Sequence, residues 1–203
     1  MAKDTELARR SWNERYAERE YVWTVEPNQF VRTHLADLRP GTAIDLAAGE
    51  GRNAVWLAER GWSVTAVDFS SAGLAKAARL ADDHGVSLQL VEADATEWQP
   101  DEPVDLVVLA YLQLVPEQRR TVLEHARTWL RPGGTLLLVA HDVTNVEHGH
   151  GGPPSTEVCY SLDEVTAALD GLTLTTAEVA ERHVATDDGD KVALDTLVVA
   201  TQP

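Results

Sequence analysis

Asp45-Leu46-Ala47-Ala48-Gly49-Glu50-Gly51-Arg52-Asn53 is the stretch that decides the fold. An apolar run, residues 42–47, leads into it and a helical pattern over 52–60 follows, so it is a turn from a strand into a helix. Gly49 and Gly51 allow backbone conformations that a Cβ disfavours and let the chain pass close to a ligand. Since open α/β sheets bind ligands where their strands end, the stretch predicts a ligand site here.

The middle of the chain repeats this strand and helix unit. We expect strands at 42–47, 63–67, 87–91, 105–109 and 134–140, with helices at 52–60, 71–84 and 116–130. The strand segments are nearly continuous apolar runs, which is typical of strands that are covered on both faces. Repeated units of this kind predict a parallel sheet with helices on both sides.

The two ends of the chain read differently. Helices are expected at 5–20 and 28–38, and the C-terminal part holds a Gly/His/Pro-rich loop over 141–154, a helix at 161–169 and strands at 172–181 and 191–201. Asp188-Gly189 between the last two strands is a hairpin signal, so that pair should be antiparallel. The sequence predicts an α/β fold of the Rossmann-like, doubly wound type, with a seven-stranded, mostly parallel sheet that ends in an antiparallel hairpin.

Composition narrows the function classes. The 203 residues include 33 acidic and 17 basic side chains, for a net charge of −16. Such a surface repels phosphate backbones and anionic membranes, so we expect neither a nucleic-acid nor a membrane partner. The N-terminus lacks a signal-peptide core and no apolar run reaches the roughly 18 residues of a membrane span, which predicts a cytoplasmic protein. Cys159 is the only cysteine, so no disulfide can form within the chain.

Three aspartates follow three successive strands: Asp45, Asp68 and Asp94. Asp45 can hold a cationic amine, Asp68 lies where an acid accepts both ribose hydroxyls, and Asp94 could accept from an adenine amino group. Each aspartate alone could equally be a helix cap or a turn residue. Their joint spacing with the glycine turn favours a ligand that carries a nucleoside.

The turn differs from the dinucleotide fingerprint. G-x-G-x-x-G aligns with Ala47, Gly49 and Arg52, so only one glycine is in place. A nicotinamide-dependent oxidoreductase is therefore the less favoured interpretation. A ligand without a pyrophosphate needs the close backbone but not the triple-glycine turn.

These residues resemble motif I, the motif II acid and the adenine-side acid of class I S-adenosylmethionine-dependent methyltransferases, although Ala47 replaces the first glycine of E/D-x-G-x-G-x-G. Three further runs, Trp12 to Tyr16, Glu26 to Phe30 and Gly49 to Ala58, are similar to the tellurite-resistance (TehB-like) and thiopurine methyltransferase-like group. The resemblance implies S-adenosyl-L-methionine as cofactor, S-adenosyl-L-homocysteine as product, and a small acceptor such as a thiol or a chalcogen oxyanion.

The resemblance also implies a division of the chain. Residues 1–40 are expected to form an N-terminal helical lid segment over the cofactor, and residues 41–203 the methyltransferase domain, as one globular unit that is a monomer or a homodimer. From the residues alone, the N-terminal segment could equally be a capping helix whose aromatic side chains pack in an ordinary core. The residues expected to bind the cofactor are Trp23, Asp45, Ala47, Gly49, Gly51, Arg52, Asn53, Asp68, Phe69, Ser70, Asp94, Ala95, Ala110 and Tyr111.

Four residues are candidates for the acceptor side. Tyr111 follows the fourth parallel strand and could contact the acceptor or pack under the cofactor. His141, after the fifth strand, could accept a proton or pair with an oxyanion. Arg182 and His183, at the end of the sixth strand, could hold an anionic acceptor or could be a solvated strand end. His141 and its neighbours Asp142, His148 and His150 are metal-ligand types, but methyl transfer needs no metal and we expect none.

Two other functions stay open at this point. The chain could be a non-catalytic module that binds S-adenosylmethionine, or it could methylate oxygen or nitrogen in a small metabolite. Formation of a methylated product would distinguish an enzyme from a binding module. The identity of the acceptor would distinguish an O- or N-methyltransferase from an enzyme that methylates thiols or chalcogen oxyanions.

Overall fold

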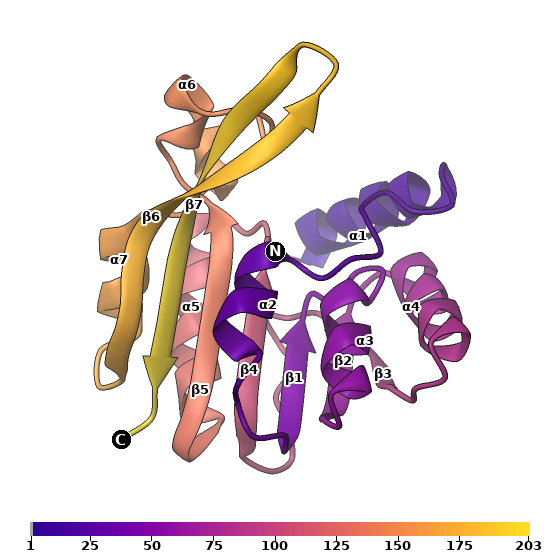
Figure 1. Ribbon diagram of the computed structural model, residues 1–203, viewed down its shortest axis with the longest axis vertical. Helices are drawn as coiled ribbons and strands as arrows, with labels where there is room; N and C mark the ends of the chain where they lie inside the picture. Colours follow the sequence, from indigo (N-terminus) through magenta and orange to yellow (C-terminus); the bar gives the residue numbers. More distant parts are fainter. Residues whose placement is uncertain (1) are drawn as a thin grey trace.

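The computed structural model describes residues 2–203, with side chains from residue 5 onward. Its seven strands form one sheet in the order β3-β2-β1-β4-β5-β7-β6 (Figure 1). The strands are β1 (Thr42–Leu46), β2 (Ser63–Asp68), β3 (Gln89–Glu92), β4 (Val104–Ala110), β5 (Leu130–His141), β6 (Thr173–Thr186) and β7 (Gly189–Thr201). The first five pair in parallel, and β7 runs antiparallel to both β5 and β6. The predicted Rossmann-like sheet with its C-terminal hairpin is confirmed.

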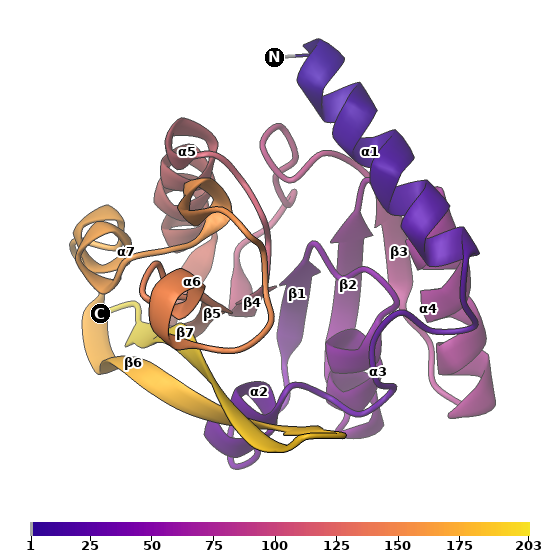
Figure 2. The ribbon, with the colours of Figure 1, turned by 90° about the horizontal axis from the view of Figure 1, so that it is seen from above.

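Helices cover both faces of the sheet (Figure 2). They are α1 (Ala2–Ala17), α2 (Gln29–Leu35), α3 (Arg52–Glu59), α4 (Ser71–Asp83), α5 (Pro116–Thr128), α6 (Asn145–His148) and α7 (Leu162–Ala168), with a 3₁₀ turn at Thr156–Val158. Helices α5 and α7 pack on one face, and α2 and α3 pack on the other, where α4 lies beside α3. No helix within residues 2–203 has the length and apolar content that crossing a membrane requires.

The strand β4 shows why its sequence is apolar throughout. Val107 and Leu109 face the layer that contains α5 and α7, whereas Leu106 and Val108 face the layer that contains α2 and α3. All four side chains are at most 2% exposed. Because successive side chains of a strand point to opposite faces, a strand covered on both sides needs an apolar residue at every position.

The C-terminal third differs from the sequence prediction in two details. The hairpin is longer than expected, since β6 continues to Thr186, and it projects beyond the body of the sheet (Figure 1). The loop at 141–154 contains the short helix α6. This loop is also held in place: the Asn145 side chain accepts from the Leu194 N–H at 2.7 Å and donates to the Gly151 carbonyl at 2.9 Å.

A buried ion pair joins the turn after β1 to helix α4. Lys76 Nζ lies 2.8 Å from Glu50 Oε1, and the two side chains are only 7% and 4% exposed. The same ammonium donates to the Arg19 carbonyl at 2.7 Å, in the segment that follows α1. Removing one partner of such a pair leaves a buried charge without compensation.

We therefore expect Glu50→Gln to lower the free energy of unfolding by about 3–5 kcal/mol, as measured by urea denaturation. Glu14→Gln is the matched control because its ion pair with Arg10 is exposed, and it should cost less than about 0.5 kcal/mol. Equal midpoints and slopes for Glu50→Gln and the wild type would contradict this role of the buried pair.

Candidate functional site

The turn from β1 into α3 adopts the left-handed conformation at three positions. Ala47, Gly49 and Gly51 have φ angles of 60°, 55° and 80°. Gly51 is required, because a Cβ there would lie 2.6 Å from the Cβ of Ala77 on α4. Ala47 adopts the same conformation without being glycine, at a cost of about 1–3 kcal/mol, and strain of this kind is found at functional sites.

Asp45 lies at the base of this turn and has a carboxylate oxygen without a partner. The residue is 1% exposed, and among the described residues its Oδ2 has no hydrogen-bond donor. Burial raises the pKa of Asp45 to about 7, although the Ala54 N–H and the nearby Arg52 both favour the charged form. An orphaned buried carboxylate oxygen fits a ligand that brings a cationic amine.

Asp68, at the end of β2, is bound by the same turn. Its Oδ2 accepts from the Gly49 N–H and its Oδ1 accepts from the Ser70 N–H, both at 2.8 Å. Burial nevertheless raises the pKa of this carboxyl. Each carboxylate oxygen has a second lone-pair site, so Asp68 can still accept hydrogen bonds from a pair of hydroxyls.

Asp94 follows β3 and caps its own turn. Its Oδ1 accepts from the N–H and the hydroxyl of Thr96, each at 2.8 Å. Together with Phe69, it lines a cleft of about 710 Å³ between the end of β3, α1 and α5. Ala95 packs against the hydrophobic core and does not line this cleft.

The N-terminal segment contacts the turn directly. Tyr16 is 5% exposed, and a Cβ on Gly49 would lie 2.6 Å from its hydroxyl oxygen. Burial, together with the charge of Asp68, raises the pKa of Tyr16. Glu50 accepts from the backbone N–H groups of Val22 and Trp23 at 2.9–3.1 Å. The Trp23 side chain itself remains 41% exposed.

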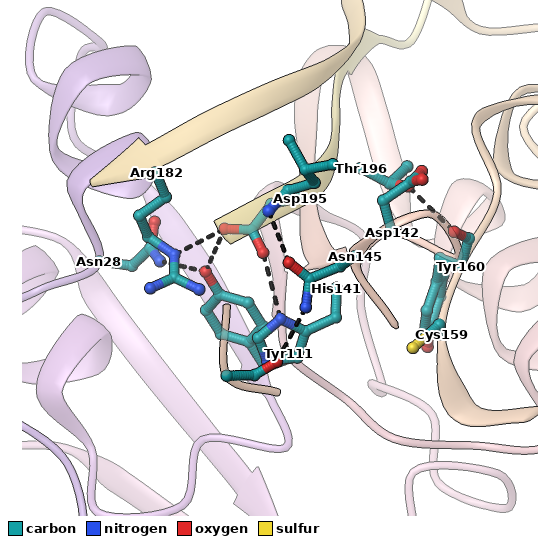
Figure 3. A network of polar contacts seen from close by, with 12 residues as sticks. Asn28, Tyr111, His141, Asp142, Asn145, Cys159, Tyr160, Arg182, Asp195 and Thr196 are labelled. Atoms are coloured by element: carbon teal, nitrogen blue, oxygen red, sulfur yellow. Dashed lines mark hydrogen bonds and ion pairs between the residues drawn. The ribbon is translucent and has the colours of Figure 1, made fainter. Parts of the chain in front are cut away.

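A second polar group gathers where β4 and β5 end, and Figure 3 shows it from close by. Asp195 Oδ2 accepts from the Tyr111 hydroxyl at 2.8 Å and from Arg182 Nε at 2.7 Å. His141 Nδ1 lies 3.3 Å from Asp195 Oδ1, and the rings of His141 and Tyr111 are 4.7 Å apart. Tyr111 has a φ of 58°, a second strained position at this sheet edge. We call these four residues the acceptor cluster.

Asn28 links the two polar groups. Its N–H donates to the Asn53 side chain at 2.9 Å, and its side-chain amide donates to the Tyr111 hydroxyl at 3.3 Å. Arg52 lies near Asp45 and Tyr111, and burial lowers its pKa. The region around the turn and the acceptor cluster therefore form one continuous site along the sheet edge.

The structure thus brings together three of the four acceptor-side candidates and separates the fourth. His183 follows Arg182 on β6, so it points the other way: its side chain is 67% exposed and its Nδ1 lies 2.7 Å from Asp190. Ala110 packs against the layer that contains α2 and α3. Among residues 5–203, no three His, Cys, Asp or Glu side chains are grouped as metal ligands.

Sequence reasoning missed Asp195, which holds the acceptor cluster together. A signal was present, because Asp195 is the one charged residue between Val192 and Thr201, an otherwise apolar or hydroxyl-bearing strand. An acid in such a strand must be paired, and it is 0% exposed here. Its partners, however, are Tyr111 directly after β4, His141 on β5 and Arg182 on β6, and only the strand register identifies them.

Part of the chain is similar to known methyltransferases. Residues 43–134 match the family model of a methyltransferase domain. Over 142 residues the chain is 34% identical to tRNA 5-carboxymethoxyuridine methyltransferase of Escherichia coli K12, and over 106 residues it is 39% identical to trans-aconitate 2-methyltransferase of Streptomyces avermitilis. These matches cover 66% and 48% of this chain but 52% and 38% of those proteins, so the chain spans about half or less of their length.

Solved structures share the fold over nearly the whole chain. TehB from Haemophilus influenzae has a TM-score of 0.76 at 17% identity, covering 94% of this chain and 67% of that one. NodS from Bradyrhizobium japonicum WM9, in complex with S-adenosyl-L-homocysteine, has a TM-score of 0.73 at 18% identity, covering 95% and 97%. The chain thus contains a match to a methyltransferase domain and has the fold of these methyltransferase structures, and its predicted likeness to the TehB-like group is confirmed at the level of fold.

The raised pKa of Asp45 leads to a testable pH dependence. A neutral carboxyl cannot pair with an ammonium, so affinity for S-adenosyl-L-homocysteine should rise as pH increases through about 7. From pH 6 to pH 8 the ionised fraction grows about 10-fold, and calorimetry should show a similar gain in affinity. Asp45→Asn should bind weakly at both values, whereas Asp101→Asn, an exposed acid before β4, should keep the wild-type dependence. A wild-type affinity that is equal at pH 6 and pH 8 would refute the pairing.

Proposed function

We propose that this protein transfers the methyl group of S-adenosylmethionine to a small-molecule acceptor. The observation that carries the proposal is the unpartnered, buried Oδ2 of Asp45 beneath the left-handed turn at 47–51. The methionine part of the cofactor supplies the cationic amine that this oxygen lacks. The methyltransferase domain match over residues 43–134 supports the same assignment.

The other parts of the cofactor have matching partners. The ribose hydroxyls pair with Asp68, whose orientation is fixed by the Gly49 and Ser70 N–H groups. The adenine lies toward Phe69 and Asp94 in the cleft after β3. The methionine carboxylate faces Arg52, which makes no ion pair among the side chains described. Residues 1–40 serve as the lid, fastened by Glu50 and Tyr16.

With the cofactor bound in this way, the methyl acceptor binds at the acceptor cluster. A methyl group on a sulfonium is already activated, so the protein needs to align the nucleophile for in-line displacement and to exclude water. The TehB-like motifs favour a soft acceptor such as a thiol or a chalcogen oxyanion. Although one relative is named for a tRNA nucleoside, the net charge of −16 disfavours nucleic acid and supports a small acceptor.

A second candidate is methylation of oxygen or nitrogen in a small metabolite. Several relatives are named trans-aconitate 2-methyltransferase, and NodS is named an N-methyltransferase. A third, a module that only binds the cofactor, is disfavoured because a strained Tyr111 and a buried Asp195 are costly to keep where no reaction takes place.

The cofactor assignment predicts selective binding. Calorimetry should show micromolar binding of S-adenosylmethionine and S-adenosyl-L-homocysteine and no binding of NADH. Asp68→Ala should weaken binding by about 1.5–3 kcal/mol, the range for hydrogen bonds to a charged group. Circular dichroism checks that the variant is folded. Tight NADH binding without a response to S-adenosylmethionine would overturn the proposal.

The acceptor is tested with a panel. Thiols, selenite, tellurite, halides, small phenols and trans-aconitate are incubated with labelled methyl donor, and products are identified by mass. We expect methylated product from at least one compound of the panel. Cofactor binding without product from any compound would favour the binding module instead.

A further inference from the structure

The carboxylate of Asp195 sits at a position that the sheet register fixes. On β7, Asp195 is the direct cross-strand partner of His141 on β5 and of Ala180 on β6. Its side chain is 0% exposed, so water cannot satisfy the two oxygens. Arg182, two residues along β6 from Ala180, reaches the same carboxylate. Burial acts to raise the pKa of Asp195, but contacts with His141 and Arg182 outweigh it and hold that pKa low.

The two carboxylate oxygens have different partners. Oδ2 receives two short hydrogen bonds, from Tyr111 and Arg182. Oδ1 faces only His141 Nδ1, at 3.3 Å, and neither atom has another partner among the described residues. A buried anionic oxygen left without a donor costs more than an ordinary hydrogen bond contributes. The 3.3 Å contact is not aligned as a hydrogen bond in this structure, but Nδ1 is the one possible donor that Oδ1 faces among the described residues, so a hydrogen on Nδ1 is the form that lowers this cost.

From this geometry we propose that Asp195 is a positioning residue that keeps the His141 hydrogen on Nδ1, so that Nε2 is a free base for an acceptor that arrives with a proton, a thiol or a hydroxyl group. The inference rests on the proposed methyl transfer and narrows its acceptor class. A permanent oxyanion, which has no proton to give up, would not need this arrangement.

The surroundings of the ring support this role. Tyr111 packs against one side of His141 with a ring-centroid distance of 4.7 Å, and a Cβ on Gly152 would lie 3.0 Å from Nδ1. Asn145 holds the loop that carries Gly152 by its bond to the Gly151 carbonyl. Nδ1 is sealed from solvent, whereas Nε2 is neither sealed nor bonded to any described residue. The imidazole is thus fixed in orientation and open at one nitrogen (Figure 3).

The step balances. The acceptor O–H or S–H proton passes to His141 Nε2, and the pair of electrons that it leaves forms the bond to the methyl carbon. The bond between that carbon and the sulfonium breaks, and its electrons stay on sulfur as the thioether of S-adenosyl-L-homocysteine. The imidazolium that results is stabilised by the Asp195 carboxylate at Nδ1.

The test is the tautomer of His141, read by ¹⁵N nuclear magnetic resonance of the full chain with S-adenosyl-L-homocysteine bound, at a pH where the ring is neutral. The chain has seven histidines, and His141→Gln identifies the signals by their loss. We expect a protonated Nδ1 and an unprotonated Nε2 in the wild type. A hydrogen on Nε2 would overturn the inference, even if methyl transfer is observed.

Two variants test whether Asp195 sets the tautomer of His141 or only stabilises the fold. Asp195→Asn should move the tautomer toward a hydrogen on Nε2 or mix the two forms, because a neutral amide no longer demands the Nδ1 hydrogen. Asp190→Asn is the matched control, since it alters the exposed contact of the same kind between Asp190 and His183, and it should leave the His141 signals unchanged. An unchanged tautomer in folded Asp195→Asn would overturn the inference. If that variant does not fold, the wild-type spectrum still decides.

Cofactor binding and the identity of the product distinguish a failure of the proposed function from a failure of this inference. If the chain does not bind S-adenosyl-L-homocysteine, the proposed function fails, whatever the tautomer of His141. If it binds and the acceptor panel yields product only from selenite, tellurite or a halide, the proposed function stands and the protic acceptor class is wrong. Product from a thiol or a phenol, lowered about 10²–10⁴-fold in kcat by His141→Gln, supports both.

Discussion

The sharp turn between β1 and α3 is the constraint on which the rest of the site depends. Its left-handed residues bring the Gly49 N–H to Asp68 on the neighbouring strand, while the Ala48 N–H reaches the Val67 carbonyl at 3.0 Å. The same few residues therefore orient the Asp68 carboxylate and cap helix α3 at Gly51. A wider turn would separate the acid of β2 from the helix and leave both without their backbone partners.

The same turn also holds the N-terminal segment. Glu50 accepts two backbone N–H groups from that segment and pairs with Lys76, so one buried carboxylate fastens three parts of the chain. Asn13 adds a second attachment, because its side chain accepts from the Ser70 hydroxyl at 2.6 Å. The contacts that hold the N-terminal segment against the turn also stabilise the fold. If the segment moves away from the site, some of these contacts must break.

Much of the fold could be predicted because its signals are local. Continuous apolar runs identify doubly covered strands, and the glycine turn with Asp45 and Asp68 lies within 24 residues of sequence. The length of the hairpin was less predictable, since residues beyond Glu181 have no apolar pattern and are ordered by the β6–β7 ladder. The Gly-rich loop gave no sign of its anchor, because Asn145 finds its partners 6 and 49 residues away.

The acceptor side escaped prediction for a related reason, and that reason bears on specificity. The acceptor cluster combines Tyr111, directly after β4, with residues of β5, β6 and β7, and only the cross-strand register makes Asp195 face His141. A shift by one residue would turn Asp195 to the opposite face and leave both Arg182 and His141 unpaired. The proposed cofactor half is thus built from the ends of successive strands between Asp45 and Asp94, whereas the acceptor half is set by the pairing of the C-terminal hairpin with β5. We therefore expect substitutions that change the acceptor, but not the use of the cofactor, to lie in β6 and β7.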